Sequence, residues 1–64
     1  MPNITVEILR GRTVEQRRAF VEAVTEAAVV HLGATPERTR IRFLEVGENE
    51  VAVGGEFVQP PDAS

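Results

Sequence analysis

Residues 3–16, with the sequence NITVEILRGRTVEQ, decide the fold because they contain a strand, a break and a helix start in succession. Apolar residues, most of them β-branched, alternate with the others over 3–9, which predicts a strand with one buried face. A glycine then breaks the pattern. Thr13 and Gln16 form a capping box, which places a helix start at about Val14. The stretch therefore predicts a strand that passes directly into a helix.

The pattern downstream predicts where the helix ends and where a second strand begins. Apolar residues recur at helical spacing up to residue 32, and Gly33 fits the left-handed position just past a helix end. Thr35 and Pro36 are typical of an N-cap and the first residue of a short helical turn. Alternation returns over 40–46. A crossover of about 30 residues suits a right-handed βαβ unit, so we expect two parallel strands.

The last third of the chain contains loop and turn signals. Residues 51–55, VAVGG, form a short apolar run that ends in a turn pair, which predicts a small hairpin. Residues 59–64 include two prolines and no large apolar side chain, so we expect a mobile tail there. The predicted organisation is one α/β domain over 1–58, a short βαβ unit with a small C-terminal hairpin, followed by the tail.

The length of the chain points to self-association. It has 64 residues, 42% of them hydrophobic, and a domain of this size buries only about 60% of its unfolded surface. There is no cysteine for a disulfide or thiolate site, and one histidine cannot form a multi-histidine site. A lone two-stranded parallel sheet with one helix also leaves one face of the sheet exposed, together with the unpaired outer side of each strand. We therefore expect an oligomer in which other copies cover these surfaces.

The charge balance excludes several classes of partner. Ten acidic and seven basic residues give a net charge of −3, without a basic run and with only three aromatic residues. This pattern provides neither the phosphate-binding surface nor the stacking platform of a nucleic-acid-binding protein. No apolar run approaches about 18 residues, and no signal peptide is visible at the start. We expect a cytoplasmic protein without nucleic-acid or membrane partners.

The dipeptide Met1-Pro2 suggests a catalytic amine. A proline at the second position favours removal of the initiator methionine, which would expose a secondary amine. A free α-amino group has a reference pKa of about 7.7–8.0, which burial or nearby cations lower, so this nitrogen could act as a base near neutral pH. By itself the dipeptide is a common start that carries no chemistry.

Taken together, four features resemble the 4-oxalocrotonate tautomerase family: the early proline, LRGRTVEQ at 9–16, an arginine that opens the second strand, and Gly-Gly-Glu at 54–56. The resemblance extends over about residues 2–57. It implies a keto–enol tautomerase, an isomerase that acts on a conjugated 2-oxo acid or dicarboxylate. It further implies a hexamer with active sites at the subunit interfaces, and chemistry that needs no metal or organic cofactor.

The resemblance assigns roles to four residues. Pro2 would be the general acid and base after removal of Met1. Arg40, from a neighbouring subunit, would hold the carboxylate and the 2-oxo group and stabilise the enolate, and Arg12 would bind the distal carboxylate of a dicarboxylic substrate. Val51 stands where the family pattern has a phenylalanine that lines the pocket. A smaller side chain there predicts a more open, more hydrated pocket or a bulkier substrate.

Alternatives remain at the level of the sequence. Val51 is also compatible with a catalytically silent subunit of a mixed tautomerase-like hexamer, and an exposed secondary amine could form an iminium with aldehydes. Val53 stands where dehalogenase members of the family have a glutamate, so hydrolysis is not supported. We interpret Arg42 as a structural ion-pair partner and His31 as a residue that interacts with the helix dipole. The sequence suggests no role for Arg10.

Overall fold

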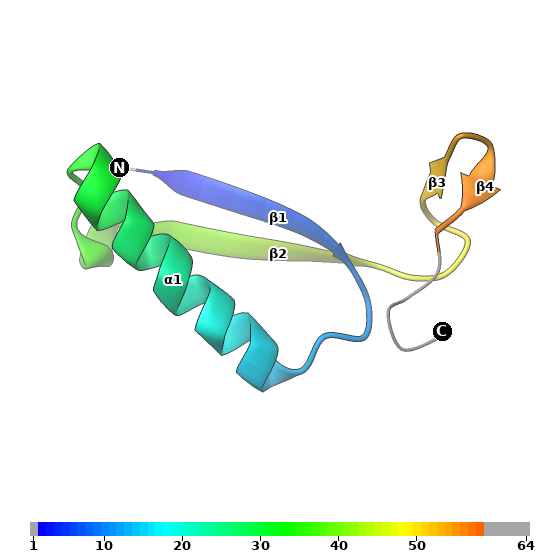
Figure 1. The fold of residues 1–64 in the computed structure, drawn as a ribbon, viewed down its shortest axis with the longest axis horizontal. Helices are drawn as coiled ribbons and strands as arrows, with labels where there is room; N and C mark the ends of the chain where they lie inside the picture. Colours follow the sequence, from blue (N-terminus) through cyan, green and yellow to red (C-terminus); the bar gives the residue numbers. More distant parts are fainter. Residues whose placement is uncertain (1, 59–64) are drawn as a thin grey trace.

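The computed structural model describes residues 2–58, which form a βαβ unit followed by a hairpin (Figure 1). The elements in chain order are β1 (Asn3–Leu9), α1 (Val14–Leu32), the 3-10 turn η1 (Pro36–Arg38), β2 (Arg40–Val46), β3 (Ala52–Val53) and β4 (Glu56–Phe57). The predicted fold class is thereby confirmed. The tail predicted at 59–64 lies outside the described residues, as does Met1.

The two long strands pair in parallel, as the crossover length predicts. Their register pairs Asn3 with Arg40 at one end and Leu9 with Val46 at the other, without an offset. In β2, Ile41 and Phe43 are half-buried, whereas the residues that alternate with them are exposed. One face of the sheet therefore packs against the rest of the chain, and the other faces outward.

The ends of α1 are fixed by local hydrogen bonds. The Gln16 N–H donates to Thr13 Oγ1 over 3.1 Å, and the Thr13 N–H donates to Gln16 Oε1 over 2.9 Å, which completes the capping box. At the other end Gly33 adopts φ +69°, the left-handed conformation that a glycine accepts without a steric cost. Both ends lie where the sequence predicts them.

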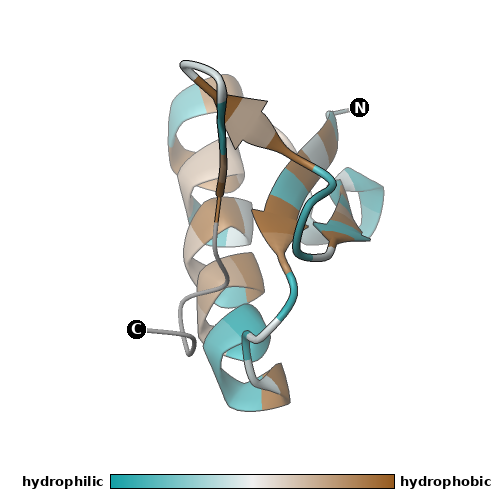
Figure 2. Cartoon of the chain, turned by 90° about the vertical axis from the view of Figure 1, so that its right-hand side faces the viewer, coloured by the Kyte–Doolittle hydropathy of each residue, from teal (hydrophilic) through white to brown (hydrophobic). Residues whose placement is uncertain are grey.

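A single chain covers little of its apolar surface. Among the described residues, Ala28 is the one buried hydrophobic side chain, whereas Phe20 is 41% exposed and Leu32 is 70% exposed. Hydrophobic bands alternate with hydrophilic ones along α1 (Figure 2). The main aromatic contact between helix and sheet joins the rings of Phe20 and Phe43, whose centroids lie 6.0 Å apart. The apolar residues that the sequence places at helical spacing are present in α1, and many of them remain exposed to solvent in a single chain.

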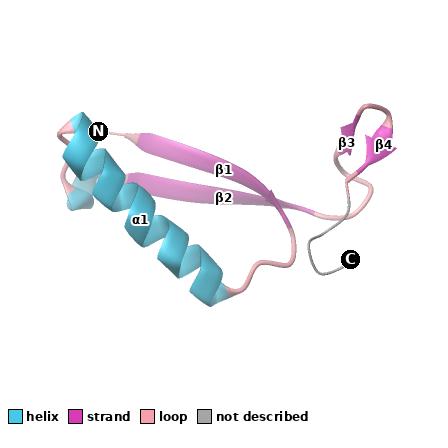
Figure 3. Cartoon of the chain, viewed as in Figure 1, coloured by secondary structure: helices cyan, strands magenta, loops and turns pink. Residues whose placement is uncertain are grey.

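The β3–β4 hairpin projects beyond the C-terminal ends of β1 and β2, away from α1 (Figure 3). Gly54 and Gly55 adopt φ values of +62° and +85°, as the two central residues of a type I′ turn require. The Val58 N–H donates to the Val51 carbonyl oxygen over 2.8 Å at the base of the hairpin. The predicted hairpin is therefore confirmed, with two residues in each strand.

The described part of the chain has no helix that combines the length and the apolar character needed to cross a membrane.

Candidate active site

Pro2 and Arg40 lie side by side at the edge of the sheet where both long strands begin. We call it the amino edge and define it by these two residues. The Arg40 N–H donates to the Pro2 carbonyl oxygen over 3.0 Å, and Pro2 is half-buried whereas Arg40 is exposed. Parallel strands start at the same edge, so the pairing of Asn3 with Arg40 brings these two residues together. The backbones of Pro2 and Arg40 are thus neighbours within one chain, and the contribution of Arg40 from a neighbouring subunit stays a prediction.

Arg42 lies further along the same exposed face, opposite Thr5 in the parallel register. We interpreted it as an ion-pair partner, but the ion pair found in the described part of the chain joins Arg17 and Glu45 instead. Arg42 is therefore an exposed cation two residues from Arg40. It serves as a natural control for any effect that depends on charge alone.

Arg12 and Val51 lie at the opposite edge, where β1 and β2 end, and these two residues define the carboxyl edge. Arg12 follows β1 and is exposed, and Val51 follows β2 and is half-buried. Because β1 has seven residues that rise ~3.3 Å each, its two ends are about 20 Å apart. One chain therefore brings Pro2 together with Arg40, but it does not bring either of them to Arg12 or Val51.

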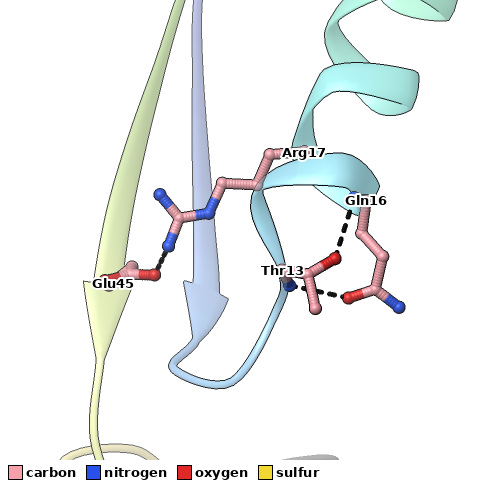
Figure 4. A network of polar contacts seen from close by, with 4 residues as sticks. All are labelled: Thr13, Gln16, Arg17 and Glu45. Atoms are coloured by element: carbon pink, nitrogen blue, oxygen red, sulfur yellow. Dashed lines mark hydrogen bonds and ion pairs between the residues drawn. The ribbon is translucent and has the colours of Figure 1, made fainter.

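The segment around Arg12 is held by polar contacts at the start of α1 (Figure 4). The capping box fixes the backbone directly after Arg12. One turn into the helix, Arg17 forms an ion pair with Glu45 of β2, and its guanidinium carbon lies 5.6 Å from the centroid of the Phe43 ring. These contacts attach the beginning of the helix to the sheet and limit the movement of the loop that carries Arg12.

A cavity of about 350 Å³ separates the first half of α1 from the sheet. Its lining is mainly apolar but includes two arginines, and consists of Val6, Ile8, Arg12, Gln16, Arg17, Phe20 and Phe43. Neither Pro2 nor Arg40 belongs to it. Within residues 2–58, no group of three or more metal-binding side chains is close enough to hold an ion.

Sequence reasoning missed two contacts at the carboxyl edge. One is the ion pair between Arg17 and Glu45, and the other is a cluster of Arg10, Gly47 and Glu50. Both join a residue near the start of the chain to one near the end of β2. These contacts can be predicted only once the parallel register is known, because the register places the segments that follow β1 and β2 at one edge.

The site and fold together define an enzyme class that known proteins allow us to identify. A family model described as "Tautomerase enzyme" matches residues 2–59. A 2-hydroxymuconate tautomerase from Bacillus subtilis (strain 168) is 44% identical over 55 residues, which cover 86% of this chain and 89% of the relative. The chain therefore belongs to the tautomerase family.

Solved structures agree with this assignment. A structure of the 4-oxalocrotonate tautomerase isozymes from Methylibium petroleiphilum matches with a TM-score of 0.84 and 43% identity, covering 88% of each chain. A heterohexamer 4-oxalocrotonate tautomerase from Chloroflexus aurantiacus J-10-fl matches with a TM-score of 0.83 and 26% identity, covering 89% of this chain and 92% of that one. The chain is an isomerase of the 4-oxalocrotonate tautomerase type.

Proposed function

We propose that the protein is a keto–enol tautomerase for a conjugated 2-oxo dicarboxylate of the 2-hydroxymuconate type, and that Pro2 acts as its general base and acid after Met1 is removed. The observation that carries this proposal is the position of Pro2 beside Arg40 at the amino edge, with a hydrogen bond between their backbones. The Bacillus subtilis relative, named for 2-hydroxymuconate, supports the substrate class.

The proposed reaction moves one proton. The lone pair of the Pro2 nitrogen takes the proton of the enol hydroxyl group, and the electron pair of that O–H bond forms the C=O bond. The double bonds shift along the conjugated chain, and a carbon atom takes the proton back from the protonated ring nitrogen. No atom is gained or lost, and the base is regenerated.

The arginines stabilise the charge that develops during this transfer. Arg40 is exposed, so its planar guanidinium can bind the carboxylate and the 2-oxo oxygen of a substrate in two places, as a contribution from a neighbouring subunit requires. Preorganised positive charge stabilises the enolate oxygen and disfavours protonation of the nearby amine. Arg12 binds the distal carboxylate, so a dicarboxylate gains an ion pair that a monocarboxylate lacks.

The geometry requires more than one chain for this site. Pro2 lies at the amino edge and Arg12 at the carboxyl edge of the same sheet, about 20 Å away along β1. We therefore propose that the amino edge of one chain meets the carboxyl edge of another in a homo-hexamer. The uncovered side chains of Phe20, Leu32 and Phe57 support an assembly that buries them.

A second proposal follows from Val51. Its small side chain would give a more open pocket, and the heterohexamer from Chloroflexus aurantiacus shows that mixed assembly occurs among similar proteins. The chain would then be a silent subunit that supplies walls to the active site of a related partner. In that case the purified chain alone would assemble without turning over any enol substrate.

Intact mass spectrometry and a kinetic assay of the purified native chain test the first proposal. We expect a mass that lacks Met1 and turnover of 2-hydroxymuconate. A retained methionine would turn the Pro2 nitrogen into an amide without basicity, and the mechanism would then be wrong. Loss of Met1 without turnover would favour the silent subunit.

A further inference from the structure

Arg10, for which the sequence suggests no role, covers the first residue of the loop after β2. Its backbone N–H donates to the Val46 carbonyl oxygen over 2.7 Å, which extends the strand pairing by one residue. Its side chain lies over Gly47, which is buried. A Cβ atom built on Gly47 would lie 2.5 Å from Arg10 Nη1 and 3.4 Å from Arg10 Cζ. The guanidinium therefore occupies the space that any larger residue at position 47 would need.

Glu50 approaches Gly47 from the same side. The Gly47 N–H donates to Glu50 Oε1, and the Glu50 N–H donates to the Gly47 carbonyl oxygen over 3.3 Å, so one pair of residues closes the turn twice. The same Cβ position would lie 3.3 Å from Glu50 Oε1. The Arg10 guanidinium and the Glu50 carboxylate thus both lie next to Gly47. We call Arg10, Gly47 and Glu50 the Gly47 clamp.

The clamp joins the two segments that carry the carboxyl-edge residues. Arg10 lies two residues before Arg12, and Glu50 directly precedes Val51. The backbone hydrogen bond from Arg10 to Val46 links the segment after β1 to the end of β2, and the Arg10 side chain adds packing against Gly47. Arg12 therefore lies between two attachments to β2 and the loop after it, the clamp at Arg10 and the ion pair between Arg17 and Glu45, and opening the clamp would release the first of them.

We infer that the Gly47 clamp is a positioning device that fixes Arg12 relative to Val51 and so sets the preference of the enzyme for substrates with a second carboxylate. The inference rests on the proposed function of Arg12. None of the three residues of the clamp contacts the substrate. Because the grip on the distal carboxylate depends on geometry, a displacement of about 1 Å is enough to weaken it strongly.

Gly47→Ala is the most direct probe. The backbone of Gly47 is not in the left-handed region, so alanine is compatible with it, but its methyl group must displace the Arg10 guanidinium. We expect KM for 2-hydroxymuconate to rise roughly 10-fold. KM for phenylenolpyruvate, an enol with one carboxylate, and kcat for both substrates should stay close to the wild-type values.

Four further variants separate the clamp from a general loss of folding. Arg10→Ala should raise KM for the dicarboxylate as much as Gly47→Ala does, and the double variant should be no worse than either single one, because both remove the same contact. Glu50→Gln keeps an acceptor for the Gly47 N–H but removes the charge, and should have a smaller effect. Arg18→Ala removes an exposed arginine of α1 and should change neither KM.

The outcomes distinguish this inference from the proposed function. Equal rises of KM for both substrates, or additive effects in the double variant, would overturn the inference while the tautomerase activity stands. If the wild type converts neither substrate, the proposed function of the site fails, and hydrogen exchange then tests the clamp itself. Exchange at the Gly47 amide should be roughly 10-fold faster in Arg10→Ala than in the wild type, and an unchanged rate would refute the clamp.

Discussion

The two edges of the β1–β2 sheet differ in what they contribute. The amino edge carries Pro2 and Arg40, whose backbones are joined by a hydrogen bond. The carboxyl edge carries Arg12, the proposed partner of a distal carboxylate, and Val51, which stands where the family pattern has a pocket-lining phenylalanine. Because parallel strands start together and end together, each edge collects one half of the proposed site and separates it from the other half.

This difference teaches that the tertiary fold of one chain cannot complete the site. The same parallel pairing that brings Arg40 to Pro2 keeps Arg12 about 20 Å from them along β1. Assembly and catalysis are therefore coupled in our account.

The largest expected effect is at the amino edge. Pro2→Ala retains a free amine but replaces a secondary amine by a primary one on a more flexible tether. We expect kcat for 2-hydroxymuconate to fall about 10²-fold or more, in the range that general-base catalysis contributes. Steady-state kinetics would measure the loss, and an unchanged circular dichroism spectrum would show that the fold survives. A rate equal to that of the wild type would exclude Pro2 as the base.

Arg40→Ala should have the second-largest effect on kcat. Removing the group that stabilises the enolate oxygen should lower kcat about 10²-fold, a typical cost for one such donor. The matched control is Arg42→Ala, which removes an exposed arginine from the same face of β2. If both variants lose the same activity, a general positive field and not a specific contact explains the effect.

The expected effect at the carboxyl edge is smaller and depends on the substrate. Arg12→Ala should raise KM for the dicarboxylate roughly 10-fold, because the substrate loses one partly exposed ion pair with the protein. KM for phenylenolpyruvate should not change, since it has no distal carboxylate. A loss of kcat with both substrates would contradict the division of roles between the two edges.

The smallest expected effect concerns stability alone. Thr13→Ala removes the hydroxyl group that accepts from the Gln16 N–H, and losing such a cap costs about 1 kcal/mol of unfolding free energy. Urea denaturation at a fixed protein concentration would measure it, since assembly makes apparent stability depend on concentration. Thr13→Ser, which keeps the hydroxyl group, is the control. Equal stability of both variants would mean that the capping box does not hold the start of α1.

Much of the fold is predictable because local signals set it. The β-branched alternation fixes β1, the pair of Thr13 and Gln16 starts α1, and Gly33 ends it, each through contacts within a few residues. The turn at Gly54 and Gly55 is likewise local. These elements needed no knowledge of what packs against them, so the sequence contained enough information to place them.

The contacts at the carboxyl edge depend on tertiary pairing and could not be predicted in the same way. Arg17 reaches Glu45, and Arg10 reaches Gly47, only because the parallel register brings the ends of β1 and β2 together. An arginine in a helix or loop has many possible partners in a sequence. For the same reason the sequence predicts an ion pair for Arg42, whereas within residues 2–58 the ion pair is formed by Arg17 and Glu45.

A mixing experiment tests most directly whether one site uses the two edges of different chains. Pro2→Ala and Arg12→Ala chains are each assayed alone with a subsaturating dicarboxylate, and then after refolding together in equal amounts. If Pro2 and Arg12 of a site come from different chains, random assembly gives about a quarter of the sites both wild-type residues, and activity should rise to about a quarter of the wild-type level. Activity that stays at the mean of the two separate variants would contradict the account.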